Sequence, residues 1–172
     1  RRNQRRRARP GPPRPGSPRP GSRRSARADQ PWPAWRELKR RIRTPLAGGE
    51  NIAGQDAFAD AIAAGALDVI QPDIAKWGGF SHCVAVARAA RGAGKTFCPH
   101  YLGGGIGLAA SAHLLAAVGG DGLLEVDINP NPLREALAGP AGDIRDGQVT
   151  LGEAPGLGIA PDLAAFEVYR TA

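Results

Sequence analysis

The sequence predicts an α/β fold in which short buried strands alternate with amphipathic helices. The alternation runs from residue 29 to residue 128 and indicates a parallel sheet or barrel. Four polar residues stand at the ends of successive strand-like runs, Glu50, Asp73, His100 and Glu125, at intervals of 23, 27 and 25 residues. Each interval is about one strand plus one helix, and the carboxyl ends of parallel barrel strands meet at one face. The pattern therefore predicts one pocket that gathers three carboxylates and a histidine.

Four segments carry apolar residues at the period of amphipathic helices, and these are residues 31–42, 55–66, 81–94 and 105–118. The first predicts a short helix after Pro33 that places Trp35, Leu38 and Ile42 on one face. The second is expected to end near Gly65, because glycine favours the left-handed conformation that terminates helices.

Four short apolar runs alternate with those helices and are expected to be strands, residues 44–50, 67–73, 95–100 and 122–128. The run LDVIQPD is almost continuously apolar, which is typical of a strand buried on both faces. Beyond these runs, residues 129–139 predict a loop with one helical turn. Residues 144–159 predict a β-hairpin that turns at Asp146–Gly147.

Positive charge is concentrated in the first 28 residues. The chain has a formal net charge of +7, but residues 1–28 hold 11 Arg and no acid, and the rest has 12 Lys and Arg against 16 Asp and Glu. The body of the chain is therefore mildly acidic, and nucleic-acid binding would depend on the basic segment alone. That segment contains almost only Arg, Pro, Gly, Ser and Ala, which predicts disorder. Three interpretations stay open: an out-of-frame stretch after a frameshift, a linker, or an arm that binds RNA or SH3 domains.

The two cysteines, Cys83 and Cys98, give neither a disulfide framework nor a metal-binding spacing, and we expect a reducing, cytoplasmic location. No run of about 18 apolar residues indicates a membrane span, and no apolar segment after the basic N-terminus indicates a signal peptide. The chain contains no methionine, so we expect it to be a fragment or a translation that lacks its start.

The motifs GGENIAG, DVIQPDIAKWGG, CPHYLGGGIGLAASAHLLAA, LLEVD and PGLGI follow one another in this order. In order and spacing they resemble the C-terminal half of the enolase superfamily, in particular the mandelate racemase and muconate-lactonizing group and its acid-sugar dehydratases. The resemblance implies an α/β fold that is the C-terminal half of a modified (β/α)8 TIM barrel. It divides the chain into a tail (1–28), a partial barrel with strands 5–8 (29–140) and an extension that returns to the capping domain (141–172).

The resemblance also implies roles for residues at the strand ends. Glu50 matches the third of three carboxylate ligands for Mg²⁺. Asp73 and His100 match an acid–base dyad that moves a proton on the carbon next to a carboxylate, and a carboxylate on one imidazole nitrogen makes the other more basic. Glu125 matches a residue that hydrogen-bonds the substrate carboxylate, which requires it to carry or share a proton. Lys76 matches a lysine that helps to surround the substrate.

Several of these assignments have simpler alternatives. Glu50 could cap a helix beside Asn51, and Lys76 could be an exposed loop lysine. Asp127, two residues beyond Glu125, could face the pocket in its place.

Two other features invite functional interpretations. The remaining histidines, His82 and His113, lie within predicted helices and are expected to be surface or satisfied core residues. The glycine-rich run Gly103–Gly107 lacks the Lys-Ser/Thr ending of a phosphate-binding loop. It could bind an anion at a helix N-terminus, but we expect a close-packed loop that leaves room for substrate beside His100.

The predicted function is that of a lyase (dehydratase) or isomerase (racemase) that acts with Mg²⁺ on a small hydroxy acid or sugar acid. Two of the three expected Mg²⁺ ligands and a Lys-x-Lys pair are missing from this sequence, so we expect this truncated chain to be inactive alone. Intact relatives are expected to be homo-oligomers, and neither a membrane nor a nucleic acid is an expected partner. The alternative is a non-catalytic scaffold whose basic tail binds nucleic acid.

Overall fold

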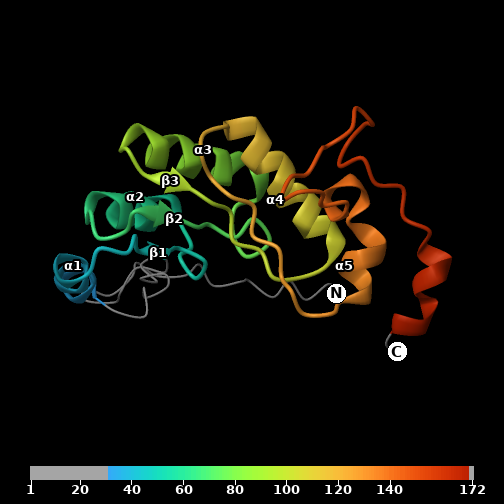
Figure 1. The fold of residues 1–172 in the computed structure, drawn as a ribbon, viewed down its shortest axis with the longest axis horizontal. Coiled ribbons are helices and arrows are strands. Elements are labelled where there is room, and N and C mark those ends of the chain that lie inside the picture. The colour runs from blue at the N-terminus through green and yellow to red at the C-terminus, as the bar shows by residue number, and fades with distance from the viewer. Residues whose placement is uncertain (1–30, 171–172) are drawn as a thin grey trace, which may run out of the picture.

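The computed structural model describes residues 31–170 of the chain (Figure 1). Helices and strands alternate through the first two thirds of this region, and short helices follow. In chain order they are α1 (Trp32–Arg41), β1 (Ala47–Gly48), α2 (Gln55–Ala63), β2 (Val69–Ile70), α3 (Gly79–Gly92), β3 (Thr96–Phe97), α4 (Gly105–Val118), α5 (Pro132–Leu137), and the 3-10 helices η1 (Gly139–Gly142) and η2 (Leu163–Tyr169). The predicted α/β class is confirmed, whereas the predicted tail lies outside the described residues.

The three strands form one parallel sheet in the order β1-β2-β3. Val69 of β2 lies opposite both Ala47 and Thr96. Pairing beyond β2 and β3 continues as a parallel bridge between Asp73 and His100. The His100 N–H donates to the Pro72 carbonyl at 3.2 Å in this extension. The register therefore sets the two polar residues side by side at the carboxyl ends of adjacent strands.

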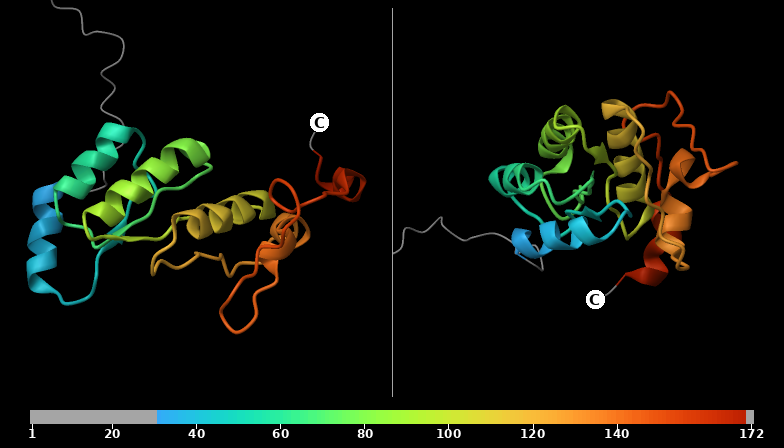
Figure 2. Two further views of the ribbon diagram at one scale, coloured as in Figure 1. Left: turned by 90° about the horizontal axis from the view of Figure 1, so that it is seen from above. Right: turned by 60° about the vertical axis from the view of Figure 1, so that its left-hand side comes forward.

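Helices α2, α3 and α4 lie side by side along the sheet, with α3 in contact with both neighbours (Figures 1 and 2). Phe58 of α2, Ile70 of β2 and Phe97 of β3 are each at most 2% exposed. Burial of such a side chain contributes about 1.5–3 kcal/mol relative to its exposure. This core fixes the strand ends from which the candidate site residues project.

Helix α1 packs on this core through only part of the predicted face, because Trp35 packs against it as predicted but Leu38 and Ile42 do not. Trp32 and Trp35 lie against the buried cluster, whereas Leu38 and Ile42 are 42% and 37% exposed. Two large aromatic side chains cover more apolar area than the smaller aliphatic ones, so they determine the rotation of the helix. Lys39 Nζ adds an ion pair to Asp68 Oδ1 at 2.5 Å.

The predicted fourth strand, residues 122–128, does not form. The chain runs beside β3, because the Leu123 N–H donates to Cys98 Sγ at 3.2 Å and a Cβ at Gly122 would lie 1.9 Å from the Phe97 carbonyl oxygen. No strand is assigned there, and Leu123 and Ile128 are 75% and 93% exposed. In the described residues the Leu123 N–H donates to a side-chain sulfur and not to a backbone carbonyl of β3, so the backbone ladder of a fourth strand is not made.

The predicted hairpin is reduced to its turn. Asp146 and Gly147 both have positive φ, 51° and 73°, as the turn chemistry requires. A single antiparallel bridge joins Arg145 and Gln148, and no longer ladder follows in the part of the chain described. The predicted helical turn in residues 129–139 is α5. Among residues 31–170, no helix has the length and apolar composition needed to cross a membrane.

Candidate active site

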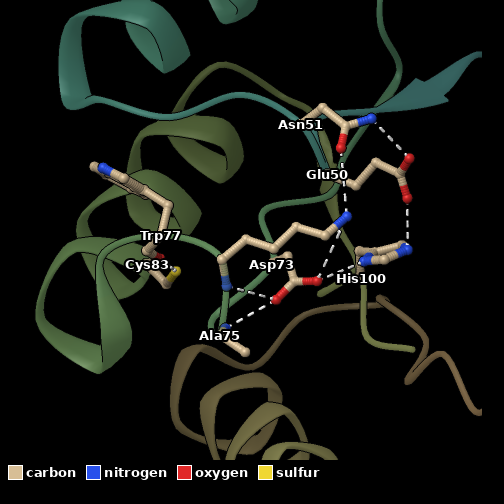
Figure 3. Close-up of polar contacts among 8 residues, drawn as sticks. Glu50, Asn51, Asp73, Ala75, Trp77, Cys83 and His100 are labelled. Carbon is tan, nitrogen blue, oxygen red and sulfur yellow. Dashed lines mark hydrogen bonds and ion pairs between the residues drawn. The ribbon is translucent and has the colours of Figure 1, made fainter. Parts of the chain in front are cut away.

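Asp73 and His100 form a buried pair at the strand ends, with residue exposures of 4% and 6%. Asp73 Oδ2 lies 2.9 Å from His100 Nδ1 (Figure 3). The other oxygen, Oδ1, accepts the backbone N–H groups of Ala75 and Lys76 at 2.8 and 3.0 Å. The carboxylate is therefore fixed by the turn that follows its strand, and it holds the imidazole through one nitrogen.

Glu50 approaches the same imidazole from the opposite side. Its Oε2 lies 2.5 Å from His100 Nε2, and its Oε1 accepts the Asn51 side-chain amide at 2.9 Å (Figure 3). An ionised carboxylate can only accept hydrogen bonds, so both nitrogens of the imidazole face acceptor oxygens. The predicted convergence of the first three strand-end residues is thus present in the structure.

Lys76 lies beside the pair and is about half exposed. Its Nζ is 3.9 Å from Asp73 Oδ2 and donates to Asn51 Oδ1 at 3.4 Å. Its side chain therefore contacts the carboxylate that orients His100. Contact of Lys76 with substrate stays a prediction.

A cavity of about 350 Å³ adjoins Glu50 and His100, and Glu125 also lines it. Glu125 Oε2 is buried without a hydrogen-bond partner among the described residues. Asp127 points elsewhere, and its Oδ2 lies 3.5 Å from Arg134 Nη1. The backbone N–H of Asn129 donates to Asp127 Oδ1 and holds the pKa of Asp127 below its usual range. Of the two carboxylates, Glu125 is the one that faces the cavity.

The described residues do not by themselves fit a complete Mg²⁺ site. Among them, no three His, Cys, Asp or Glu side chains are arranged to hold a metal ion. Both oxygens of Glu50 are already engaged, by Asn51 and by His100. Mg²⁺ requires a near-octahedral shell of oxygen atoms, and Glu50 can supply only part of one.

The glycine-rich run packs against Tyr101, the residue after His100. The backbone N–H groups of Gly104 and Gly107 donate to the Tyr101 hydroxyl, and a Cβ at Gly107 would lie 2.1 Å from the Tyr101 ring. Burial, together with the charge of Asp73, raises the pKa of Tyr101. The hydroxyl therefore occupies the N–H groups that an anion at the start of α4 would use, which supports the expectation of a close-packed loop.

The remaining candidate groups lie outside the cavity. His82 is exposed on α3 with its Nδ1 against the Gly78 carbonyl, and His113 is half-buried in α4. Burial, with the charge of Asp73, raises the pKa of the Cys83 thiol to about 11, so this cysteine is not a nucleophile at neutral pH.

Sequence reasoning missed several residues that contribute to this site. Trp32, Trp35 and Gln71 also line the cavity, as does Asn51, which connects Glu50 to Lys76. A signal existed for Asn51, which directly follows Glu50. The tryptophans come from α1, whose rotation on the core could not be read from its apolar period.

Comparisons with known proteins agree with this geometry. A family of enolase C-terminal domain-like proteins matches residues 27–165. A D-galactarolactone cycloisomerase of Agrobacterium fabrum is 34% identical over 134 residues, 73% of this chain and 35% of that protein. An arabinonate dehydratase of Saccharolobus solfataricus is 29% identical over 133 residues, 77% of this chain and 35% of the relative. The chain thus spans about a third of the length of these curated relatives.

Solved structures show the same relationship. A mandelate racemase/muconate lactonizing enzyme from Bordetella bronchiseptica RB50 superposes with a TM-score of 0.79 at 59% identity, covering 83% of this chain and 40% of that one. The 3,6-anhydro-D-galactonate cycloisomerase from Zobellia galactanivorans superposes with a TM-score of 0.72 at 27% identity, covering 80% and 39%.

Proposed function

The chain belongs to the enolase C-terminal domain-like family, and on that premise we propose that it supplies the acid–base part of an enzyme acting on sugar acids. The reaction class is proton transfer on the carbon next to a carboxylate, as a dehydratase or an isomerase. The buried Asp73–His100 pair, with Nε2 of His100 at the cavity wall, carries this proposal.

The pair has the arrangement that general acid–base catalysis needs. Asp73 holds Nδ1 as a donor, so Nε2 is the atom that exchanges a proton with a ligand. When Nε2 is bare it can take the proton from the carbon, and the electron pair of that bond passes to the carboxylate as an enediolate. When Nε2 is protonated it can give the proton to a leaving hydroxyl, so that the C–O bond breaks and water departs. Glu50 contacts Nε2 in the structure, so the substrate must replace that contact.

Glu125 is proposed to face the carboxylate of the substrate. An ionised Glu125 would repel that group, so the contact requires a shared proton between the two. A buried oxygen without a partner is suited to this role, because the substrate would supply the missing hydrogen bond. Glu125 therefore selects for acids over neutral sugars in this proposal.

The Mg²⁺ ion implied by the family is not accommodated by the described residues alone. The steps proposed here are accordingly those of the chain's own side chains, and Glu50 remains a prospective ligand to be completed by groups outside this chain. For the same reason we expect the 172-residue chain alone not to turn over sugar acids. Dehydration of an aldonate by the purified chain would contradict this expectation.

Names of relatives support the substrate class. One is a cycloisomerase of a galactarolactone and others are dehydratases of arabinonate and galactonate. All of these names denote sugar acids or their lactones, which carry the carboxyl function that the site requires. The scaffold alternative depends on residues 1–28, which lie outside the described residues, and it stays a prediction.

A grafted enzyme tests the proposal. Residues 31–170 would replace the matching segment of the 59%-identical Bordetella protein, and consumption of a panel of aldonates and aldarates would be measured. His100→Asn should lower the rate by about 10²–10⁴-fold, the usual contribution of a positioned acid–base group. His82→Asn, an exposed histidine outside the cavity, is the matched control and should leave the rate unchanged. A His100→Asn graft as active as the unsubstituted graft would refute the assignment.

A further inference from the structure

The segment that carries Glu125 is held by side chains in place of a strand ladder. Before Glu125, the Leu123 N–H donates to Cys98 Sγ at 3.2 Å, and the leucine that follows packs on the apolar cluster of α4. After Glu125 the apolar side chains give no such support, because Val126 and Ile128 are exposed. The placement of the Glu125 carboxylate therefore depends on what holds the chain immediately beyond it.

Arg134 of α5 contacts the chain at that point. Its Nη1 lies 3.5 Å from Asp127 Oδ2, and its Nη2 donates to the backbone carbonyl of Asn129. Asp127 Oδ1 in turn accepts the backbone N–H and the side-chain amide of Asn129, at 2.9 and 2.7 Å. One guanidinium group thus joins α5 to the residues that stand two and four positions beyond Glu125.

The ion pair is buried, which distinguishes it from the surface pairs of this chain. The side chains of Arg134 and Asp127 are 11% and 16% exposed. Among the described residues, Asp127 is the ion-pair partner that the structure gives this guanidinium. Separation of a buried pair is strongly disfavoured, because it leaves a charge that neither water nor a partner compensates. The contact therefore restrains the chain beyond Glu125 more than an exposed pair would.

Helix α5 is itself fixed to the helix that begins five residues after His100. Helices α4 and α5 are in contact (Figure 1). A Cβ at Gly105, the first residue of α4, would lie 2.1 Å from the backbone nitrogen of Ala138, which directly follows α5. At the start of α5, the Arg134 N–H donates to Asn131 Oδ1 at 3.1 Å. The packing of α4 and α5 thus sets the position from which the guanidinium group reaches the segment.

We propose that Arg134 is a positioning residue that keeps the Glu125 carboxylate in the cavity by holding Asp127 and Asn129 against α5. This inference rests on the proposed function, because that function gives Glu125 its contact with the substrate carboxylate. Arg134 lines a separate cavity of about 410 Å³ and is not among the described residues around the cavity that Glu125 and His100 share. Its effect on the substrate therefore passes through the segment that carries Glu125.

Amide hydrogen exchange in the 172-residue chain tests the restraint without any measurement of activity. Arg134→Met removes both contacts of the guanidinium group and keeps much of the apolar length of the side chain. Exchange of the Asn129 N–H, which donates to Asp127, should become faster by about tenfold or more. The reason is that a hydrogen bond to a charged group contributes about that factor to an equilibrium constant.

Two comparisons make this result specific. The Cys98 N–H, which donates to the Ile70 carbonyl at 3.2 Å, should exchange at the same rate in the variant and in the unsubstituted chain. Arg145→Met is the matched control, because Arg145 forms an exposed ion pair with Asp143 at 3.0 Å. It should leave exchange of the Asn129 N–H unchanged. Equal exchange of that N–H in Arg134→Met and in the unsubstituted chain would overturn the proposal.

Values of kcat/KM in the grafted enzyme separate positioning from stability. Arg134→Met, Glu125→Gln and the double variant would be measured with an aldonate as substrate. Arg134→Met should lower kcat/KM by about 10–10²-fold, since a misplacement of about 1 Å can cost about 10²-fold. The double variant should be about as fast as Glu125→Gln alone, because Arg134 then has no further group to position. A role in stability alone lowers the amount of folded enzyme by the same factor in both backgrounds, so losses that multiply would contradict the proposal.

A conservative variant and the single Glu125 variant complete the test. Arg134→Lys keeps a cation beside Asp127 but cannot make both contacts, so it should show the same non-additivity with a smaller loss, and it replaces Arg134→Met if that variant does not fold. An unchanged kcat/KM in Glu125→Gln would contradict the role of Glu125 in the proposed function, and this inference with it. A slow Glu125→Gln enzyme with an independent loss from Arg134→Met would leave the proposed function standing and overturn the positioning role alone.

Discussion

Substitution of Gly105 by alanine tests the close packing that places α4 behind the loop after His100. Gly105 is the first residue of α4 and is buried. A Cβ there would lie 2.1 Å from the Ala138 nitrogen and the Leu137 carbonyl carbon, both backbone atoms. No side-chain rotation can relieve such a contact. The start of α4 must therefore move away from α5 and η1 by about 1.4 Å to reach the ~3.5 Å of an ordinary contact.

The expected change in the free energy of unfolding of Gly105→Ala follows from two opposed effects. Overpacking of this kind costs about 1–3 kcal/mol, while alanine in place of glycine favours a helix by up to about 1 kcal/mol. Gly92 is the matched control, since it is the last residue of another 14-residue helix and has nothing within 4 Å of its Cβ position. Gly92→Ala should therefore gain stability where Gly105→Ala loses it. Because the gain in helix propensity applies to both variants, the expected difference between them is the overpacking cost of about 1–3 kcal/mol.

Urea unfolding followed by circular dichroism at 222 nm measures this difference directly. Gly105→Ala should unfold at a lower urea concentration than the unsubstituted chain, and Gly92→Ala at an equal or higher one. Equal stability of the two variants would refute the close approach of α4 to residues 137 and 138, and with it the stated reason for glycine at position 105.

Two further predictions concern the pH dependence of stability and the cysteines. The Lys39 ammonium, with the Leu46 N–H, lowers the pKa of Asp68 below its usual 3.8, so this stabilisation is present above pH 3.8 and is lost as the pH falls through the folded pKa. Lys39→Met should therefore lower the free energy of unfolding at pH 7 by at most about 1 kcal/mol and make the loss of stability below about pH 4 shallower. The measurement is the urea midpoint as a function of pH, and parallel curves for the two proteins would contradict this. Cys83 is fully buried and the pKa of its thiol is raised to about 11. Iodoacetamide at pH 8 should therefore label Cys98 first, as measured by peptide mass spectrometry. Equal labelling rates of the two cysteines in the folded chain would show that Cys83 is accessible.

Local sequence patterns were sufficient to locate the site. The βα period predicted that Glu50, Asp73 and His100 would meet, because the register of parallel strands brings their carboxyl ends to one edge. The helix formed by residues 105–118 was also predicted with its observed bounds. These features depend on interactions within one βα unit or between neighbouring units, which leave a repeated signal in the sequence.

Other features depend on groups distant in the sequence. Residues 122–128 have the composition of a strand, but the Leu123 N–H donates to Cys98 Sγ and not to a backbone carbonyl, so no ladder with β3 forms in the described region. The contact between Glu50 and Nε2 of His100 depends on side-chain rotamers and on the amide of Asn51. The phenol of Tyr101 fills the start of α4, which the glycine pattern alone could not reveal.

The central claim is that Asp73 and His100 act as one proton-transfer unit, and a double-mutant cycle in the grafted enzyme tests it most directly. Rates of sugar-acid consumption would be measured for Asp73→Asn, His100→Asn and the double variant. If Asp73 acts only through His100, the double variant should be no slower than His100→Asn alone, because residues that act as a unit are strongly non-additive. Losses that multiply in the double variant would show two independent contributions and would contradict the account.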